Sequence, residues 1–346
     1  MQAQSVPGHY PSAAMITDPA APPLPTTPER LLSPAVMARL DRLDVASRKL
    51  LRGSLPGERR SRRRGRSVEF DDFRDYAPGD DLRHVDWNIY ARLDRLYVKL
   101  FREEEDLALN ILVDNSASMD MGSPGKLLFA HQLAFALAYV GILRQHRVSV
   151  ATFAPRRRPD DPALIRLAPL RGRTAAKRIG NFLIESLNSA RDARPSGPTR
   201  PEATFNAALR TFAEHMGGKG VSLVISDFLS PAPFDSGLAA MGARTMAGHA
   251  DVWCLQVLSP EELDARLGIG SGLQGDLRLT DVESLEAVDV TVTPAVAEVH
   301  RASFETARDR FREQCAGRGI AHALIPSDAP LDQLLTGTIR RRGLLR

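Results

Sequence analysis

Residues 107–119 read LALNILVDNSASM, and this stretch decides how the fold is interpreted. Ile111, Leu112 and Val113 form a short apolar run that ends at Asp114. Small polar residues follow at once, which is typical of a buried strand that leads into a loop. We therefore predict that a core strand places the Asp114 side chain at the start of a polar loop.

The polar loop carries one carboxylate and two hydroxyls at alternate positions, on Asp114, Ser116 and Ser118. Small, hard oxygen ligands of this kind suit Mg²⁺, Mn²⁺ or Ca²⁺ and do not suit zinc or copper. The same residue types are common in turns and at helix N-termini. The pentapeptide alone therefore fits either a metal site or an ordinary strand-to-helix turn, and the rest of the chain must decide.

The composition is that of a globular protein with one large domain or two ordinary ones: 346 residues, 43% apolar and 25% charged. No stretch of the sequence approaches about 18 consecutive apolar residues, and its N-terminus lacks the pattern of a secretory signal, so we expect a cytoplasmic protein without a membrane-spanning helix. Cys254 and Cys315 lie far apart without C-x-x-C spacing, which argues against a zinc ribbon and a disulfide framework.

Composition changes along the chain predict four segments. Residues 58–106 combine an Arg run, six acidic residues and several aromatic residues, and the aromatic residues favour a packed unit over a solvated loop. The predicted segments are a disordered Pro-rich tail over 1–27, an amphipathic helix (34–51) with a linker over 28–57, an Arg-rich, acidic and aromatic β-rich segment over 58–106, and an α/β domain over 107–346.

In the last segment, strand-like runs alternate with helical ones, which predicts a mainly parallel central sheet flanked by helices. One predicted strand ends at Asp114, and another, Val221 to Ile225, is followed by Asp227. In such sheets, binding sites lie beyond the carboxyl ends of the strands. We therefore expect Asp114 and Asp227 to lie together, and this shared position favours the metal site over a plain turn.

The D-x-S-x-S motif at one strand end, with a second Asp after another strand, resembles the metal-ion-dependent adhesion site of von Willebrand factor A domains. A larger pattern resembles a bacterial family catalogued as domain of unknown function number fifty-eight. The matching residues are Arg62 to Gly65, Glu69-Phe70, Arg74 to Tyr76, Pro78 to Asp81, Arg83, Asp86-Trp87, Ala91-Arg92, Asp114 to Met119, Ile225 to Phe228, and Arg341 to Gly343.

The resemblance implies an A-domain-like α/β core that carries an N-terminal β-rich insertion. It also implies a metal site, with Mg²⁺, Mn²⁺ or Ca²⁺ held by Asp114, Ser116, Ser118, Asp227 and a threonine from a second loop. Thr204 stands one residue short of the family's usual spacing, whereas Thr199 follows a Gly-Pro pair. We slightly favour Thr199, because Thr204 falls where a helix is predicted, and both remain candidates.

The resemblance further implies a non-enzymatic role in binding other proteins. Family members are often encoded beside a MoxR-type AAA+ ATPase, and the pair is thought to act in assembling or maturing protein complexes. We expect the metal to accept a Glu or Asp carboxylate from the partner. The residues assigned to partner binding are Arg62, Arg63, Arg64, Asp80, Asp81 and Arg83.

Other functions fit the sequence less well. Gly270 to Gly275 matches the dinucleotide-binding pattern, but its predicted flanking elements come in the reverse order. Ser123-Pro-Gly-Lys126 matches S-x-x-K without the companion motifs or a regular helical turn. The Arg59 to Arg66 run suits nucleic acid, but the acidic residues that follow would repel a polyanion. A metal-dependent phosphoesterase needs a general base near Asp114 that the sequence does not identify.

Overall fold

The computed structural model describes residues 24–47, 69–102, 107–122, 124–154, 162, 164–192, 201–230, 233–263, 275–280 and 287–346. The chain divides into two compact units, of which one comprises Met1–Gly53 with Leu107–Arg346 and the other Ser54–Asp106. Arg62, Arg63 and Arg64 lie outside the described residues, as does Thr199.

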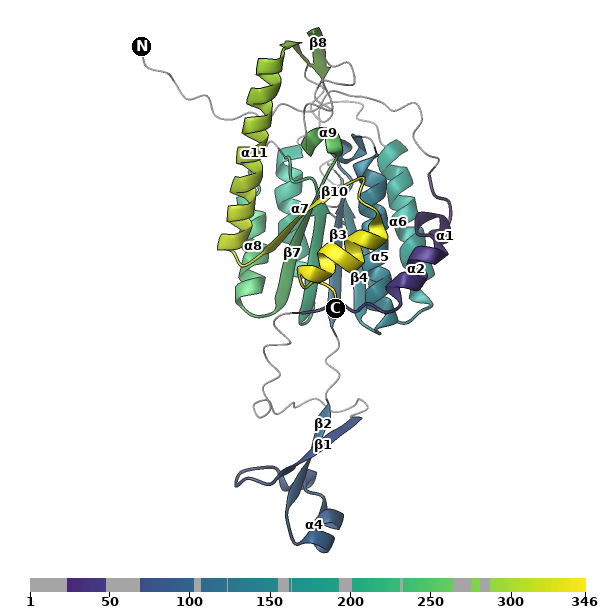
Figure 1. Ribbon diagram of the computed structural model, residues 1–346, viewed down its shortest axis with the longest axis vertical. Helices are drawn as coiled ribbons and strands as arrows, with labels where there is room; N and C mark the ends of the chain where they lie inside the picture. Colours follow the sequence, from purple (N-terminus) through teal and green to yellow (C-terminus); the bar gives the residue numbers. More distant parts are fainter. Residues whose placement is uncertain are drawn as a thin grey trace, which may run out of the picture. The chain divides into compact units, whose positions relative to one another are not determined.

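A sheet in the order β10-β7-β6-β3-β4-β5 forms the centre of the larger unit, counting the described residues (Figure 1). All neighbouring strands are parallel except β4 and β5, which are antiparallel. The predicted α/β fold with a mainly parallel sheet is confirmed. The strands are β3 (Ala108–Asp114), β4 (Arg147–Phe153), β5 (Ile165–Leu170), β6 (Gly220–Ser226), β7 (Ala250–Leu258) and β10 (Ala321–Pro326).

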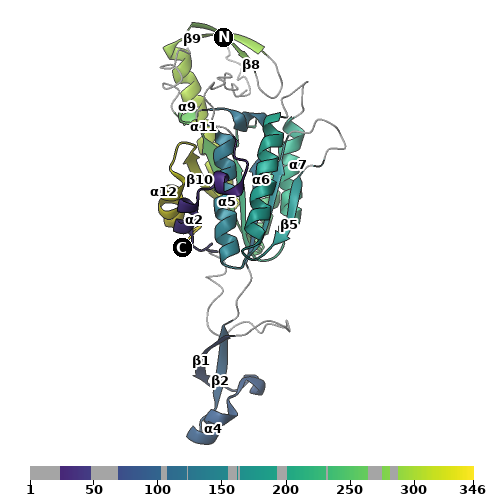
Figure 2. The ribbon, with the colours of Figure 1, turned by 90° about the vertical axis from the view of Figure 1, so that its right-hand side faces the viewer.

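Helices cover both faces of this sheet. Successive side chains of β3 point to opposite faces, so Ile111 and Val113 join one core and Leu112 joins the other. α5 and α6 lie side by side over the first face (Figure 2), and α7, α8 and α11 contribute to the second core. The main helices are α5 (Lys126–Leu143), α6 (Ala175–Asp192), α7 (Pro201–His215), α8 (Asp235–Met246) and α11 (Pro294–Gly317).

Short elements complete the larger unit. The C-terminal segment contains helical turns that include Leu335 and Ile339, both fully buried. The elements are α1 (Pro28–Leu31), α2 (Pro34–Leu40), η2 (Ala117–Asp120), α9 (Pro260–Leu263), α12 (Leu331–Gln333), η3 (Leu334–Ile339), and the antiparallel pair β8 (Gly275–Thr280) and β9 (Ala287–Val292).

Every residue of β3 is buried because helices cover both faces of the sheet, which explains why its sequence is almost continuously apolar. α5 is likewise apolar on most sides. Among the described residues it is the one helix long and apolar enough to cross a membrane, and 78% of it is buried inside the protein. A core helix of this kind has the same composition as a membrane helix.

The helix predicted from Pro34 to Leu51 is shorter than expected, because α2 ends at Leu40. The chain that follows pairs with the C-terminus instead. Val45 forms an antiparallel bridge with Leu345, and the Ala46 amide donates a hydrogen bond of 2.8 Å to the Leu344 carbonyl. Backbone pairing with a segment about three hundred residues away thus replaces the helix that the local pattern favours.

The smaller unit is an antiparallel pair of strands, β1 (Glu69–Asp75) and β2 (Tyr97–Arg102), joined by η1 (Leu82–His84) and α4 (Trp87–Leu93). Asp86 caps α4 by accepting hydrogen bonds from the Asn88 and Ile89 amides. The Asp86 carboxylate also lies 2.9 Å from the Lys99 ammonium, which joins the helix to β2.

Candidate metal-binding site

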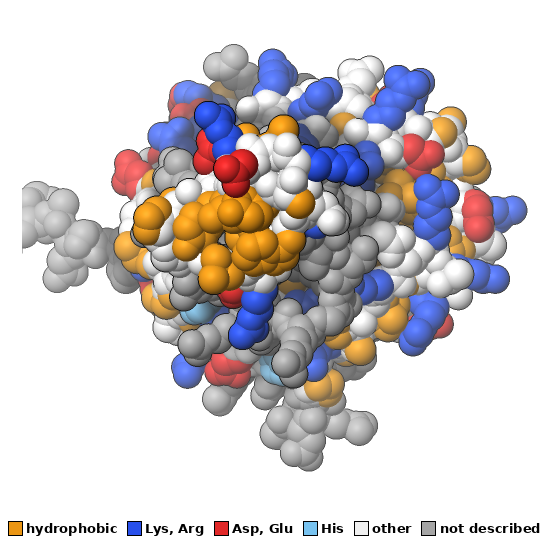
Figure 3. All heavy atoms as spheres, turned by 90° about the horizontal axis from the view of Figure 1, so that it is seen from below, with side chains coloured by type: hydrophobic (Ala, Val, Ile, Leu, Met, Phe, Trp, Pro, Cys, Tyr) orange, Lys and Arg blue, Asp and Glu red, His pale blue; other side chains and the backbone are white. Residues whose placement is uncertain are grey.

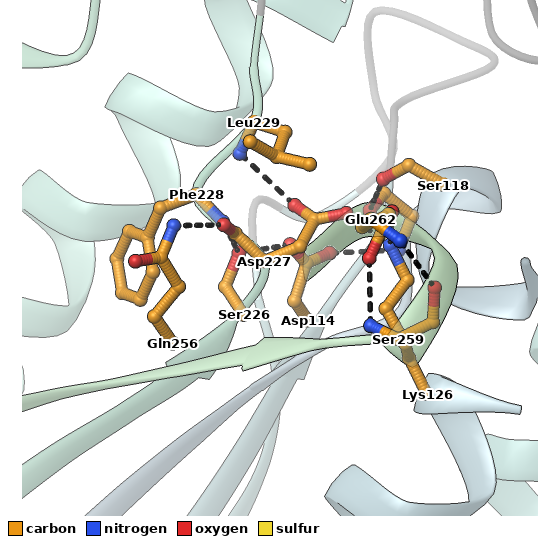
Figure 4. Close-up of polar contacts among 11 residues, drawn as sticks. Asp114, Ser118, Lys126, Ser226, Asp227, Phe228, Leu229, Gln256, Ser259 and Glu262 are labelled. Carbon is orange, nitrogen blue, oxygen red and sulfur yellow. Dashed lines mark hydrogen bonds and ion pairs between the residues drawn. The ribbon is translucent and has the colours of Figure 1, made fainter. Parts of the chain in front are cut away.

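Asp114 and Asp227 lie together at the carboxyl ends of adjacent parallel strands. Asp114 is the last residue of β3, Asp227 directly follows β6, and the register pairs Val113 with Ile225. Both carboxyl groups are drawn close to one another in Figure 4. Both residues are 3% exposed, so two acidic side chains are buried at one end of the sheet.

The Asp114 carboxylate is held by its own loop and by β6. It accepts a hydrogen bond of 2.8 Å from the Ser116 amide and one of 2.6 Å from the Ser226 hydroxyl. Burial, followed by the nearby Asp227 carboxylate, raises the pKa of Asp114 to about 7. The pKa of Asp114 is raised because no positive charge among the described residues balances its buried carboxylate. A bound cation would balance that charge.

The two serines of the motif lie in the same loop as Asp114. Their Oγ atoms are 2.9 Å apart, and Ser116 is buried at the start of η2. Among the described residues, no group of three or more His, Cys, Asp or Glu side chains is arranged to hold a metal ion. A cation at this position must therefore use the serine hydroxyls together with the two aspartates, and this oxygen-only donor set fits Mg²⁺, Mn²⁺ or Ca²⁺.

The threonine of the predicted ligand set stays undecided. Thr204 lies in the first turn of α7, as its sequence context indicated, but its side chain is outside the described part of the structure. Thr199 is outside it entirely. The structure therefore brings together four of the six residues predicted to bind the metal, and Thr199 and the Thr204 side chain lie outside its described part.

Asp227 is positioned by its neighbours in sequence and by β7. Its Oδ1 atom accepts a hydrogen bond of 3.1 Å from the Leu229 amide, and its carbonyl accepts one of 2.8 Å from the Gln256 side chain. Phe228, between Asp227 and Leu229, has a φ of +54°, a conformation uncommon for a residue other than glycine. This turn carries the chain away from β6 immediately after the carboxylate.

Lys126, the first residue of α5, is a member of the site that the sequence analysis did not identify. Its ammonium lies 3.0 Å from Asp227 Oδ2 and 2.5 Å from Glu262 Oε1, and the residue is fully buried (Figure 4). Burial alone would lower the pKa of Lys126, but the two carboxylates outweigh it and hold that pKa above its usual value. The ammonium is therefore charged.

Glu262 belongs to α9, which begins beside the loop that follows β3. Ser259 and Glu262 form a reciprocal cap: the Ser259 amide donates to Glu262 Oε2 at 2.8 Å, and the Glu262 amide donates to Ser259 Oγ at 3.3 Å. A Cβ on Gly122 would lie 2.4 Å from the Ser259 Cβ, so the two loops are in close contact. The S-x-x-E spacing signals the cap in the sequence, but not the contact with Lys126.

Counting the described side chains, three carboxylates meet one ammonium at this end of the sheet. If all are ionised, Asp114, Asp227 and Glu262 exceed Lys126 by two negative charges. One divalent cation would balance them. Without a cation, buried carboxylates take up protons instead, which is the direction seen for the pKa of Asp114 and of Glu262, raised first of all by burial.

The residues assigned to partner binding lie in the smaller unit where they are described. Asp80 accepts hydrogen bonds from the Arg74 guanidinium at 2.7 Å and from the Ala77 amide at 2.9 Å. Asp81 caps η1 through the Arg83 amide, and the Arg83 side chain is 90% exposed. Both acidic residues therefore have a structural role in their turn, and Arg83 is the more accessible group.

Large apolar side chains are exposed on η1 and α4 of the smaller unit. Trp87 and Tyr90 meet edge to face with their ring centroids 6.1 Å apart, and apolar side chains gather on the face drawn in Figure 3. Exposed aromatic and apolar groups of this kind often mark contact surfaces. The exposed fractions are 53% for Leu82, 56% for Trp87, 40% for Tyr90 and 61% for Leu93.

A family model described as Protein of unknown function DUF58 matches residues 72–314, which is more than half of the chain. The chain belongs to the DUF58 family. The DUF58 match includes most of the smaller unit, both aspartates of the candidate site, and Lys126 and Glu262.

This DUF58 protein has relatives in mycobacteria. Uncharacterized proteins of Mycobacterium bovis and Mycobacterium tuberculosis are each 26% identical over 307 residues, covering 88% of this chain and 86% of the relative. A solved structure, the pilus adhesin SpaC from Lactobacillus rhamnosus GG, is 10% identical with a TM-score of 0.39, covering 70% of this chain and 32% of the adhesin. The chain thus spans about a third of that adhesin.

Proposed function

We propose that this DUF58 protein is a divalent-metal-dependent protein-binding module and not an enzyme. The observation that carries the proposal is the convergence of Asp114, Ser116, Ser118 and Asp227 at the ends of β3 and β6. A von Willebrand factor A-like core with an adhesion-type metal site, preceded by a β-rich insertion, is the finer form of the same proposal. The mainly parallel sheet supports it, since sites in such sheets lie at the carboxyl ends of strands.

In the proposed site, the two serine hydroxyls coordinate the ion directly, and the two aspartates act directly or through water. Mg²⁺ prefers six oxygen ligands and readily keeps some water molecules. The protein side chains leave at least one position for an outside ligand. A Glu or Asp carboxylate of a partner protein matches that position in charge and hardness, so the bound ion would supply an electrophile for partner capture.

The proposed partner is a MoxR-type AAA+ ATPase, with the DUF58 protein acting as an adaptor in assembly or maturation of protein complexes. The family resemblance supports this assignment. The exposed Trp87, Leu93 and Arg83 of the smaller unit add a second surface of the composition common at protein interfaces.

The alternative functions gain no support from the described residues. Nucleic-acid binding depends on Arg59 to Arg66, which lie outside them. A phosphoesterase needs a free general base beside Asp114, but Glu262 and Asp227 are both ion-paired with Lys126.

The test is calorimetric titration of the purified protein with Mn²⁺ and Mg²⁺. Asp114→Ala should abolish binding of the ion, because it removes a central carboxylate. Asp120→Ala is the matched control, since Asp120 lies in the same loop but pairs with Arg191 at 3.1 Å and is exposed. The control should bind like the natural protein. Unchanged affinity in Asp114→Ala would refute the site.

The partner assay uses the purified ATPase immobilised on a biosensor. Binding of the DUF58 protein should be lost in EDTA and restored by Mg²⁺, and Asp114→Ala should not bind under either condition. Equal binding in EDTA and Mg²⁺ would show that the metal plays no part in partner capture.

A further inference from the structure

The Lys126 ammonium is a cation that the chain itself supplies to the candidate site. It is fully buried, and it lies 3.0 Å from Asp227, one of the two aspartates proposed to hold the metal (Figure 4). A buried ammonium is retained only when carboxylates compensate it. Lys126 meets this requirement with Asp227 on one side and Glu262 on the other.

Both carboxylate oxygens of Asp227 are already engaged. The Leu229 amide donates to Oδ1, and the Lys126 ammonium contacts Oδ2. The Asp114 carboxylate, in contrast, is contacted by a hydroxyl and an amide and by no cation among the described residues. A divalent ion that uses Asp227 must therefore share this carboxylate with the ammonium or displace it.

Glu262 can keep the Lys126 ammonium paired when a metal ion binds Asp227. Its second oxygen is anchored by the Ser259 amide at 2.8 Å, while Oε1 contacts Lys126 at 2.5 Å. Ser259 in turn packs against Gly122, which lies at the end of the loop that carries Asp114, Ser116 and Ser118. Glu262 is thus held in position independently of Asp227, and it keeps the ammonium paired in either arrangement.

We propose that Lys126 sets the cation affinity of the site: its ammonium competes with a divalent ion for Asp227, and Glu262 retains the ammonium when the ion binds. The inference rests on the proposed function, because it assumes that an ion binds between Asp114 and Asp227. It adds two residues, from α5 and α9, that control how tightly this ion is held.

The competition predicts opposite effects for two variants. Lys126→Met removes the competing charge and leaves three carboxylates without a cation, so Mn²⁺ should bind at least about tenfold more tightly. Glu262→Gln leaves the ammonium with Asp227 alone, so Mn²⁺ should bind at least about tenfold more weakly. A structural role for Lys126 alone predicts loss of stability in both variants and no tightening in either.

The experiment measures free Mn²⁺ by electron paramagnetic resonance during titration of the full chain, together with thermal unfolding in EDTA and in Mn²⁺. Lys177→Met is the matched control, because Lys177 is exposed on α6, away from the site. The control should bind Mn²⁺ like the natural protein. In EDTA, Lys126→Met should unfold at a lower temperature than the natural protein. Addition of Mn²⁺ should raise the unfolding temperature of Lys126→Met by far more than that of the natural protein.

The outcomes separate this inference from the proposed function. If the natural protein binds Mn²⁺ and Lys126→Met binds it no more tightly, the role of Lys126 is overturned and the metal site stands. If only Lys126→Met binds Mn²⁺, the competition is supported and the metal dependence of the natural protein fails. If Lys126→Met does not fold with or without Mn²⁺, the Mn²⁺ affinity of Glu262→Gln decides. Unchanged or tighter binding of Mn²⁺ by Glu262→Gln overturns the inference.

Discussion

Replacing Asp114 by Asn should stabilise the metal-free protein at neutral pH, although it removes a proposed metal ligand. Asp114 is buried, and burial together with Asp227 raises its pKa from 3.8 to about 7. The folded protein therefore binds a proton that the unfolded chain has lost between these two values. Asn has nearly the same shape and carries no charge at any pH.

The sign follows from proton linkage. Below pH 3.8 both states of the natural protein hold the proton, and the Asp114 charge costs nothing. As pH rises to about 7, the natural protein loses stability at about 1.4 kcal/mol per pH unit, and above that pH the cost stays constant. The advantage of Asp114→Asn should therefore grow by about 3 kcal/mol between about pH 5 and about pH 7.

One local loss opposes this gain. Ser226 Oγ donates to the Asp114 carboxylate and accepts from the Phe228 amide. An Asn amide facing Ser226 would require that hydroxyl to find another acceptor, at a cost of about 1 kcal/mol. Asp114→Asn should thus be about 2–3 kcal/mol more stable than the natural protein near neutral pH and close to it near pH 5.

The assay is urea unfolding followed by circular dichroism, in EDTA, at a series of pH values. Asp120→Asn is the control, because its carboxylate is exposed and its loop is the same. The control should show no pH-dependent gain. A stability difference between Asp114→Asn and the natural protein that does not change with pH would refute the assignment of uncompensated charge to Asp114.

Two further predictions concern the scaffold. Gly122→Ala should destabilise the protein by about 2 kcal/mol or more in urea unfolding, because Gly122 has a φ of +88° and a Cβ there would meet Ser259. Gly125 has open space around it, so Gly125→Ala should change stability by less than about 0.5 kcal/mol. Similar effects of the two would contradict the contact. Asp44→Asn should lower the free energy of unfolding by about 1 kcal/mol at neutral pH. Burial raises the pKa of Asp44, but hydrogen bonds from His146 and Arg346 outweigh burial and lower that pKa to about 2. The loss of stability should therefore vanish as pH falls from 3.8 towards 2, and a loss that persists in acid would count against these pairs.

Most of the larger unit could be predicted from local sequence patterns. The apolar run before Asp114 and the all-apolar helix after it correspond to β3 and α5. The helix predicted from Pro34 to Leu51 ends at Leu40, because Asp44 to Ala46 pair with the C-terminus, and no local pattern reports such a pairing. The positions of Arg62 to Arg64 and Thr199 stay predictions, since they lie outside the described residues.

By itself, the sequence determined the order of strands and helices and the loop that carries Asp114, Ser116 and Ser118. Hydrophobic periodicity encodes these features within a few residues of each position. Only the tertiary structure decided that Lys126 lies between Asp227 and Glu262, which are 101 and 136 residues away in sequence. Ion pairs over such distances arise from how strands and helices pack, and packing alone placed the chain's own cation against the aspartate proposed to hold a metal.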